Sequence, residues 1–318
     1  MRVVLANPRG FCAGVERAIS TVEAALEQFG GPIYVRHEIV HNRHVLAALT
    51  RRGAVFVEDL QDVPLGARVI FSAHGVAPTA WREARARALK IIDATCPLVT
   101  KVHLEAVAHA RAGRTLLVIG HRGHPEVVGT VGQYLGAGGA RIEVIEDRAM
   151  AEKLVVDGPE QIAYVTQTTL SADYVAGVVV TLQRKFPRLL APHREDICYA
   201  TSNRQRAVQA IAGRCDVVIV IGADHSSNSA RLCEVAQAAG VAAYLVDSDE
   251  KVDRAWFRND GTIGVTSGAS VPEVLVEGLL AKFRRWWPDL VEETLGEPEK
   301  LHFRVPREVD RAASGRSR

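Results

Sequence analysis

The sequence NPRGFCAGVERAIS (residues 7–20) joins a predicted buried strand to a predicted helix. The apolar run at residues 2–6 predicts the strand, and apolar residues at helical spacing over residues 18–29 predict the helix, which ends at Gly30. Cys12 therefore lies in a strand-to-helix turn with a glycine on either side. The positive end of the helix favours a thiolate there, so Cys12 is a candidate nucleophile or metal ligand. A buried structural cysteine is the alternative.

The composition is typical of a globular protein with room for two or three small domains. The chain has 318 residues, of which 47% are apolar and 24% charged, with a net charge of +2. This small net charge gives no basic surface for nucleic acid. A local site for a diphosphate or another small anion is still possible. No apolar run approaches the ~20 residues that cross a bilayer, and no N-terminal signal is present, so we expect no membrane partner. Five scattered cysteines indicate a reduced, cytoplasmic protein rather than a disulfide framework.

Short apolar runs alternate with helical patterns along most of the chain. Further strands are predicted at residues 33–35, 54–57, 68–71, 91–92, 116–119, 142–145, 162–165, 217–221, 243–246 and 262–265. Helices are predicted between them, among others at residues 81–89, 102–112, 172–186 and 204–212. This βαβ alternation predicts an α/β fold with mainly parallel sheets.

Three cysteines each precede a predicted helix, roughly one small α/β unit apart. Cys12, Cys96 and Cys198 occupy these positions, with the second and third helices expected to begin near Val99 and Ser202. The loose likeness predicts three pseudo-repeated α/β units around a shared centre. The expected units are residues 14–96, residues 97–193, and residues 194–283 joined by residues 1–13, whose strand returns to the third unit. Residues 284–318 are expected to form a C-terminal strap whose end, residues 311–318, is frayed.

Polar, glycine-containing turns follow several of the predicted strands. They are SAHG (72–75), GHRGHPE (120–126), TQTT (166–169), GADHSSNS (222–229) and SGAS (267–270). In open parallel sheets, ligands bind outside the carboxyl ends of the strands, so these turns are where we expect a site.

The residue types leave several chemistries open. Three separated cysteines can hold a 4Fe–4S cluster with one open iron, or a zinc ion with a fourth ligand. The absence of any CxxC pair argues against structural zinc, and Cys215 and Cys233 fit a hydrophobic core better than a metal site. Glu126, two residues after His124, could donate a proton if burial raised its pKa, or could be an ordinary solvated acid.

Two serine turns are equally ambiguous. The run from Ser226 to Ser229 precedes a predicted helix, where it could bind phosphate oxygens or act as an N-cap. Ser270, before Val271 and Pro272, could likewise be a cap followed by a first-turn proline.

The chain resembles the family of 4-hydroxy-3-methylbut-2-enyl diphosphate reductases, which catalyse the last step of the methylerythritol phosphate route to isoprenoids. The resemblance is carried by NPRGFCAGVERAI, YVRHEIVHN, FSAHGV, DATCPLVTKVH, GHRGHPEVVGTVGQ, TQTTLS, DICYATSNRQ, SSNS and TSGASVP. These strings occur in order, with compatible spacing, from about residue 1 to 283.

The resemblance implies a three-lobed α/β protein with one central 4Fe–4S cluster per chain. It also implies reductive dehydroxylation of (E)-4-hydroxy-3-methylbut-2-enyl diphosphate to isopentenyl and dimethylallyl diphosphate, with two electrons and two protons. An external donor, such as ferredoxin or flavodoxin with its reductase, would supply the electrons. The implied metal ligands are Cys12, Cys96 and Cys198. The implied diphosphate ligands are His41, His74, Ser226, Ser227, Asn228 and Ser270; His124 and Thr168 would line the pocket and assist Glu126, the proton donor.

Two other functions compete with this reading of the residues. One is a non-enzymatic iron–sulfur redox sensor or electron carrier, and the other is zinc-assisted hydrolysis using His124 and Glu126. An electron carrier does not need a lining of histidine, hydroxyl and amide groups. The reductase is therefore the leading hypothesis.

Overall fold

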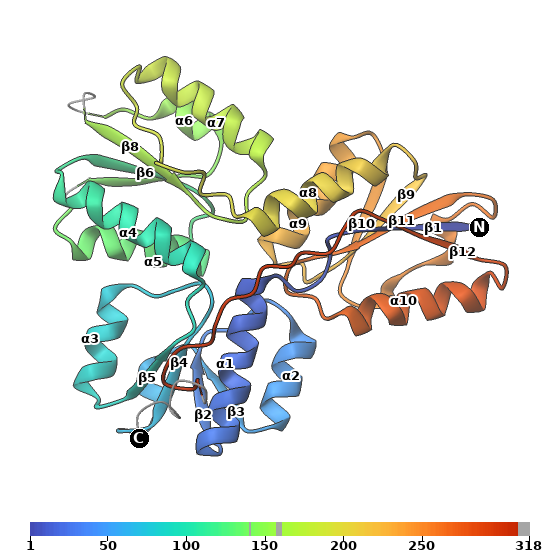
Figure 1. The fold of residues 1–318 in the computed structure, drawn as a ribbon. Coiled ribbons are helices and arrows are strands. Elements are labelled where there is room, and N and C mark those ends of the chain that lie inside the picture. Colours follow the sequence, from blue (N-terminus) through green and yellow to red (C-terminus); the bar gives the residue numbers. More distant parts are fainter. Residues whose placement is uncertain (140, 157–160, 311–318) are drawn as a thin grey trace. The chain divides into compact units, whose positions relative to one another are not determined.

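The computed structural model describes residues 1–139, 141–156 and 161–310 (Figure 1). Its named strands form three sheets in which every pair of neighbours is parallel. The α/β class with parallel sheets, predicted from the alternation of apolar runs and helical patterns, is confirmed.

Contacts between residues divide the chain into two compact units. Unit 1 contains Met1–Val15, His41–Val45 and Tyr199–Leu301. Unit 2 contains Glu16–Val40, Leu46–Cys198 and the chain from His302 onward. The boundaries of the three pseudo-repeated units stay a prediction.

Unit 1 is built on one five-stranded sheet. In spatial order its strands are β10 (Ala242–Val246), β9 (Val217–Ile221), β11 (Thr262–Ser267), β1 (Arg2–Ala6) and β12 (Val291–Leu295). Its helices are α8 (Tyr199–Ala212), α9 (Ser227–Ala238) and α10 (Glu273–Trp286).

Both faces of this sheet are covered, because successive residues of a strand point to opposite faces. Val217 and Ile219 of β9 pack in a cluster with residues of α10, whereas Val218 and Val220 pack with residues of α8 and α9. Figure 1 shows α10 on one side of the sheet and α8 and α9 on the other. This explains why β9 is a continuous apolar run rather than an alternating pattern.

Unit 2 contains the other two sheets. The first has the order β3 (Ala54–Val57), β2 (Ile33–Arg36), β4 (Arg68–Phe71) and β5 (Lys90–Asp93), and the second has the order β7 (Ile142–Ile145), β6 (Thr115–Ile119) and β8 (Ile162–Thr166). The helices are α3 (Pro78–Ala86), α4 (Pro97–Arg111), α5 (Pro125–Gly136), α6 (Arg148–Lys153) and α7 (Ala172–Lys185), together with α1 (Ala13–Phe29) and α2 (Arg43–Arg51), whose first residues belong to unit 1. Helices α4 and α5 pack on one face of the second sheet and α6 and α7 on the other.

Several predicted boundaries differ from the structure. Helix α3 begins at Pro78 rather than at residue 81, because proline is well suited to the first turn of a helix. Helices α4 and α8 begin directly after Cys96 and Cys198, earlier than predicted.

The C-terminal region differs most from its predicted form. Within the expected strap, Val291–Leu295 forms β12, an edge strand paired with β1, for which the sequence pattern predicts no strand. The residues expected to fray, 311–318, lie outside the described part of the chain. Among the described residues, no helix is long and apolar enough to span a membrane.

Candidate functional site

The candidate residues of unit 1 lie on loops at the carboxyl edge of its sheet. Strand β9 lies between β10 and β11. The chain therefore adds β10 on one side of β9 and then crosses over to add β11 on the other side. Such a reversal opens a crevice at the carboxyl ends of the strands. The loop after β9 carries Ser226, the loop after β11 carries Ser270, and the loop after β1 carries Cys12.

Asn228 ties two of these loops together. Its Oδ1 accepts a hydrogen bond of 2.8 Å from the backbone N–H of Ala269. The residue is only 6% exposed, and its Nδ2 finds no hydrogen-bond partner among the described residues. Because a buried N–H group without an acceptor costs free energy, this amide is suited to a ligand that carries acceptor oxygens.

The two serines have different local roles. Ser226 is the N-cap of α9, and its Oγ accepts from the N–H and the hydroxyl of Ser229 at 3.4 and 3.1 Å. The cap interpretation of Ser270 is wrong, because α10 begins at Glu273 with Pro272 as its N-cap. The Oγ of Ser270 instead donates to the carbonyl of His41 at 3.0 Å, which fixes the backbone next to that imidazole.

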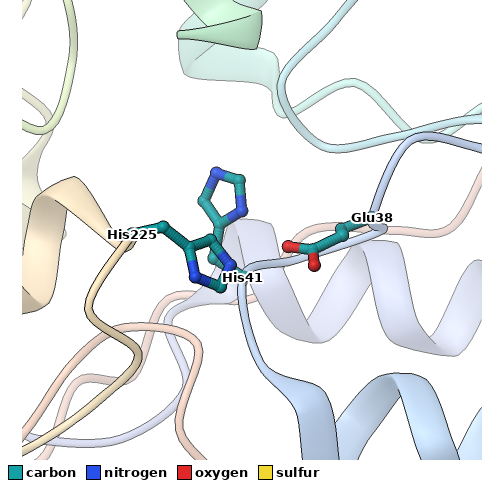
Figure 2. A group of neighbouring side chains, drawn as sticks. All are labelled: Glu38, His41 and His225. Carbon is teal, nitrogen blue, oxygen red and sulfur yellow. The ribbon is translucent and has the colours of Figure 1, made fainter. Parts of the chain in front are cut away.

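His41 faces a second imidazole within unit 1. Figure 2 shows the rings of His41 and His225, whose centroids lie 5.0 Å apart at an interplanar angle of 81°. His225 is exposed and directly precedes the cap residue Ser226. The sequence pattern alone assigns it no function.

Cys12 is held at the same edge, since its N–H donates to the carbonyl of Ala269 at 3.2 Å. The expectation of a lowered pKa for this thiol is wrong. Loss of hydration raises the pKa of Cys12, although the Arg204 guanidinium and the backbone N–H groups of Val15 and Gly14 act in the opposite direction. A thiol in these surroundings is a poor nucleophile, and a bound cation would be needed to keep it as a thiolate.

In unit 2, Glu126 is enclosed at the start of α5 and is 2% exposed. Its Oε1 accepts from the N–H of Thr168 at 2.6 Å, and its Oε2 accepts from the hydroxyl of the same residue at 3.0 Å. Burial raises the pKa of Glu126 to about 7, although both hydrogen bonds lower it. Glu126 is therefore not an ordinary solvated acid, and the carboxyl can carry a proton near neutral pH.

Two histidines are paired at the start of α5. His124 is the N-cap of α5, and its Nδ1 accepts from the N–H of Glu126 at 3.2 Å. In the neutral ring the proton is therefore on Nε2. The rings of His74 and His124 form an edge-to-face pair with centroids 5.7 Å apart.

The other two candidate cysteines are positioned by backbone hydrogen bonds. The N–H of Cys96 donates to the carbonyl of Ala73, next to His74, at 3.0 Å. The N–H of Cys198 donates to the carbonyl of Thr168 at 3.0 Å. Thr168 thus contacts Glu126 through its hydroxyl and its backbone N–H, and Cys198 through its backbone carbonyl.

All three candidate cysteines immediately precede a helix, namely α1, α4 and α8. The five cysteines are thiols in the structure, and Cys215 and Cys233 pack against the apolar cluster beside α8 and α9, as predicted.

The sequence pattern gives no sign of one charged group that supports this region. Lys101 of α4 donates to the carbonyls of Arg194 and Glu195 at 2.5 and 3.1 Å and to Oδ1 of Asp196 at 2.7 Å. Oδ2 of Asp196 accepts from the N–H of Thr166 at 2.9 Å. These bonds anchor the segment that leads to Cys198, but a lone lysine on a helix is usually solvated, so only the tertiary structure identifies it.

The structure thus gathers the predicted residues into two groups, one in each unit. Unit 1 brings together Cys12, His41, Ser226, Ser227, Asn228 and Ser270, and unit 2 brings together Cys96, Cys198, His74, His124, Glu126 and Thr168. Their catalytic and binding roles stay predictions.

Comparison with known proteins gives a consistent result over nearly the whole chain. A family model described as LytB protein matches residues 3–284. Relatives from Pseudomonas putida (strain W619) and Azotobacter vinelandii, each named 4-hydroxy-3-methylbut-2-enyl diphosphate reductase, are 52% and 53% identical over 309 residues, or 97% of this chain and 98% of each relative. The solved structure of the E-1-hydroxy-2-methyl-but-2-enyl-4-diphosphate reductase from Plasmodium falciparum matches with a TM-score of 0.92 and 37% identity, covering 100% of this chain and 99% of that chain.

Proposed function

This chain belongs to the LytB protein family, and we propose that it reduces (E)-4-hydroxy-3-methylbut-2-enyl diphosphate to isopentenyl and dimethylallyl diphosphate. Two electrons and two protons replace the hydroxyl group by hydrogen and release water. The observation that carries the proposal is the buried Glu126, held by Thr168, which in turn accepts a hydrogen bond from Cys198. Thr168 thus links a carboxyl that can be protonated at neutral pH to the backbone of a candidate metal ligand, which supports the proposal.

The three helix-start cysteines are proposed to hold one 4Fe–4S cluster per chain. Their chemistry fits this group, because three thiolates leave one iron open and helix N-termini favour negative charge. When bound, the cluster would supply electrons and an open iron able to polarise the substrate's alcohol.

We propose that the diphosphate binds chiefly to groups that donate hydrogen bonds without a fixed charge. Asn228 has an unused amide donor in unit 1, and the N-terminus of α9 presents backbone N–H groups beside it. The other proposed ligands are His41, Ser226, Ser227 and Ser270 in unit 1 and His74 in unit 2.

Glu126 is the proposed proton donor. With a pKa of about 7 it is protonated in a substantial fraction of molecules at neutral pH. A protonated Oε2 can donate to Thr168 Oγ1, whose own hydrogen then becomes available to the substrate. His124, whose neutral ring carries its proton on Nε2, is the second proposed donor to the substrate.

The non-enzymatic sensor or electron carrier is not favoured, because relatives covering nearly the whole chain are named as the reductase. We further propose a cytoplasmic location and an external donor of the ferredoxin or flavodoxin type. The three pseudo-repeated units remain our proposed domain division.

The test is anaerobic purification followed by iron analysis and turnover. We expect broad absorption near ~400 nm, about four irons per chain, and consumption of the hydroxylated diphosphate with a strong one-electron reductant. Zinc in place of iron would contradict the cluster, and a fully loaded protein without turnover would favour the sensor.

A further inference from the structure

An arginine is completely buried behind the Cys12 turn. Arg204 of α8 is 0% exposed. Its Nε and one terminal nitrogen donate to the carbonyl of Gly10 at 3.2 and 2.8 Å, and the same terminal nitrogen donates to the carbonyl of Phe11 at 3.1 Å. The other terminal nitrogen donates to the carbonyl of Ala200 at 3.0 Å. The guanidinium is thus hydrogen-bonded to the carbonyls of the two residues that immediately precede Cys12.

The charge of this arginine is balanced by the C-terminal region. Oε2 of Glu299 lies 2.9 Å from a terminal nitrogen of Arg204, and Oε1 accepts from the side-chain amide of Asn203 at 3.0 Å. Glu299 follows β12, in the region for which the sequence predicts only a strap. Apolar residues of similar volume often stabilise a core as well as a buried ion pair does, so stability alone gives no reason for charge here.

We propose that Arg204 and Glu299 are positioning residues for Cys12, and that together they set the charge around the iron–sulfur cluster that this cysteine would bind. The inference rests on the proposed function. The planar guanidinium makes three hydrogen bonds to two successive carbonyls in a fixed geometry, whereas a lysine at this position would offer a single flexible ammonium group. A buried positive charge beside a thiolate-bound cluster favours its reduced form, and the carboxylate of Glu299 moderates that effect.

The two residues therefore have opposite predicted effects on the reduction potential. Glu299→Gln removes a negative charge while keeping size and hydrogen-bonding capacity, so the midpoint potential should rise. Arg204→Met combined with Glu299→Gln removes both charges without leaving an unpaired carboxylate, so the potential should be lower than in Glu299→Gln. Arg204→Lys keeps the charge but loses the fork, so the potential should change little while iron is lost from the cluster roughly tenfold faster, the scale of one lost hydrogen bond to a charged group.

A matched control is available in the same unit. Glu293 of β12 pairs with Arg214 at 2.8 Å, but both side chains are well exposed. Glu293→Gln therefore removes the same charge from a solvated pair and should leave potential and iron retention unchanged.

The measurements are anaerobic redox titration of the loaded protein and the rate of iron loss after exposure to air. The proposal is supported if the midpoint potential rises in Glu299→Gln and falls again when Arg204→Met is added. The potential of Glu293→Gln should equal that of the wild type. Wild-type potentials and iron retention in all variants, with only a fall in thermal stability, would overturn it. If the wild-type protein binds no iron anaerobically, the proposed function fails instead, so the two failures are distinguishable.

Discussion

Both carboxylate oxygens of Glu126 are bonded to a single residue, Thr168, through its backbone N–H at 2.6 Å and its hydroxyl at 3.0 Å. The backbone donor favours the ionised carboxylate, and burial favours the protonated acid. Burial is the larger effect, because the pKa is raised to about 7. The threonine hydroxyl can donate to the carboxylate or accept from the acid, so it suits either protonation state.

Changing Glu126→Gln should lower kcat by ~10²-fold or more, the usual scale for loss of a general acid. The amide keeps the shape and can still accept from Thr168, so iron content and visible absorption should match the wild type. Steady-state kinetics with the diphosphate substrate provide the measurement. Near-normal kcat in a fully loaded variant would remove Glu126 from the mechanism.

The rate should also depend on pH in a direction set by this group. A proton donor works only while protonated, so wild-type kcat should fall as pH rises through about 7. The residual activity of Glu126→Gln should lack this decline. A wild-type rate that stays constant from pH 6 to 9 would be inconsistent with Glu126 as the acid.

Stability should change with pH in the same window. The pKa of Glu126 in the folded protein lies above its ordinary value of 4.5. Its contribution to the free energy of unfolding is therefore fully present below pH 4.5 and is lost as the pH rises through about 7. This difference between the two pKa values corresponds to about 3 kcal/mol of folding stability at most. Denaturant unfolding of wild type and Glu126→Gln, compared across this range, should show the two curves converging or crossing as pH rises. Parallel pH dependences would refute the prediction.

Thr168 can be tested separately, because its hydroxyl bonds Glu126 whereas its carbonyl accepts from Cys198. Thr168→Val should lower kcat about 10- to 100-fold by interrupting proton transfer, whereas Thr168→Ser should retain most activity. Both keep the carbonyl that accepts from Cys198, so neither should lose iron. Equal rates for the valine and serine variants would show that the hydroxyl is not used.

Asn228 should affect binding rather than chemistry. Asn228→Asp keeps an oxygen that can accept from Ala269 but replaces the unused donor with negative charge. We expect KM and the inhibition constant of inorganic diphosphate to rise roughly tenfold or more, with kcat less affected. Gln237→Glu, the same kind of change at the far end of α9, is the matched control, and an equal effect there would point to general charge repulsion.

Much of the fold follows from the sequence because parallel strands covered on both faces are continuous apolar runs. The β9 run is an example. Strand β12 has the sequence VEETL and lies at the edge of its sheet. An edge strand can expose charged side chains, so it lacks the apolar run by which the other strands are predicted. Ser270 was open to interpretation as a cap because only one residue separates it from Pro272, and local sequence does not specify where α10 begins.

The site is predictable only where residue type and position in a turn coincide. The cysteines and Glu126 stand at strand-to-helix turns, which local patterns can identify. Arg204 is different, because its burial depends on Gly10, Phe11 and Glu299, all far from it in the chain. The pKa of Cys12 likewise depends on tertiary burial, which outweighs the helix effect visible in the sequence.

The place of β1 has a consequence for biogenesis. It lies between β11 and β12, so β1 can pair with neither neighbour until residues 262–295 have been synthesised. The turn bearing Cys12 also needs Glu299, which is translated later still. The surroundings of Cys12 are therefore complete only after translation has passed residue 299, and the cluster proposed to bind there would be held in its final geometry only from that point.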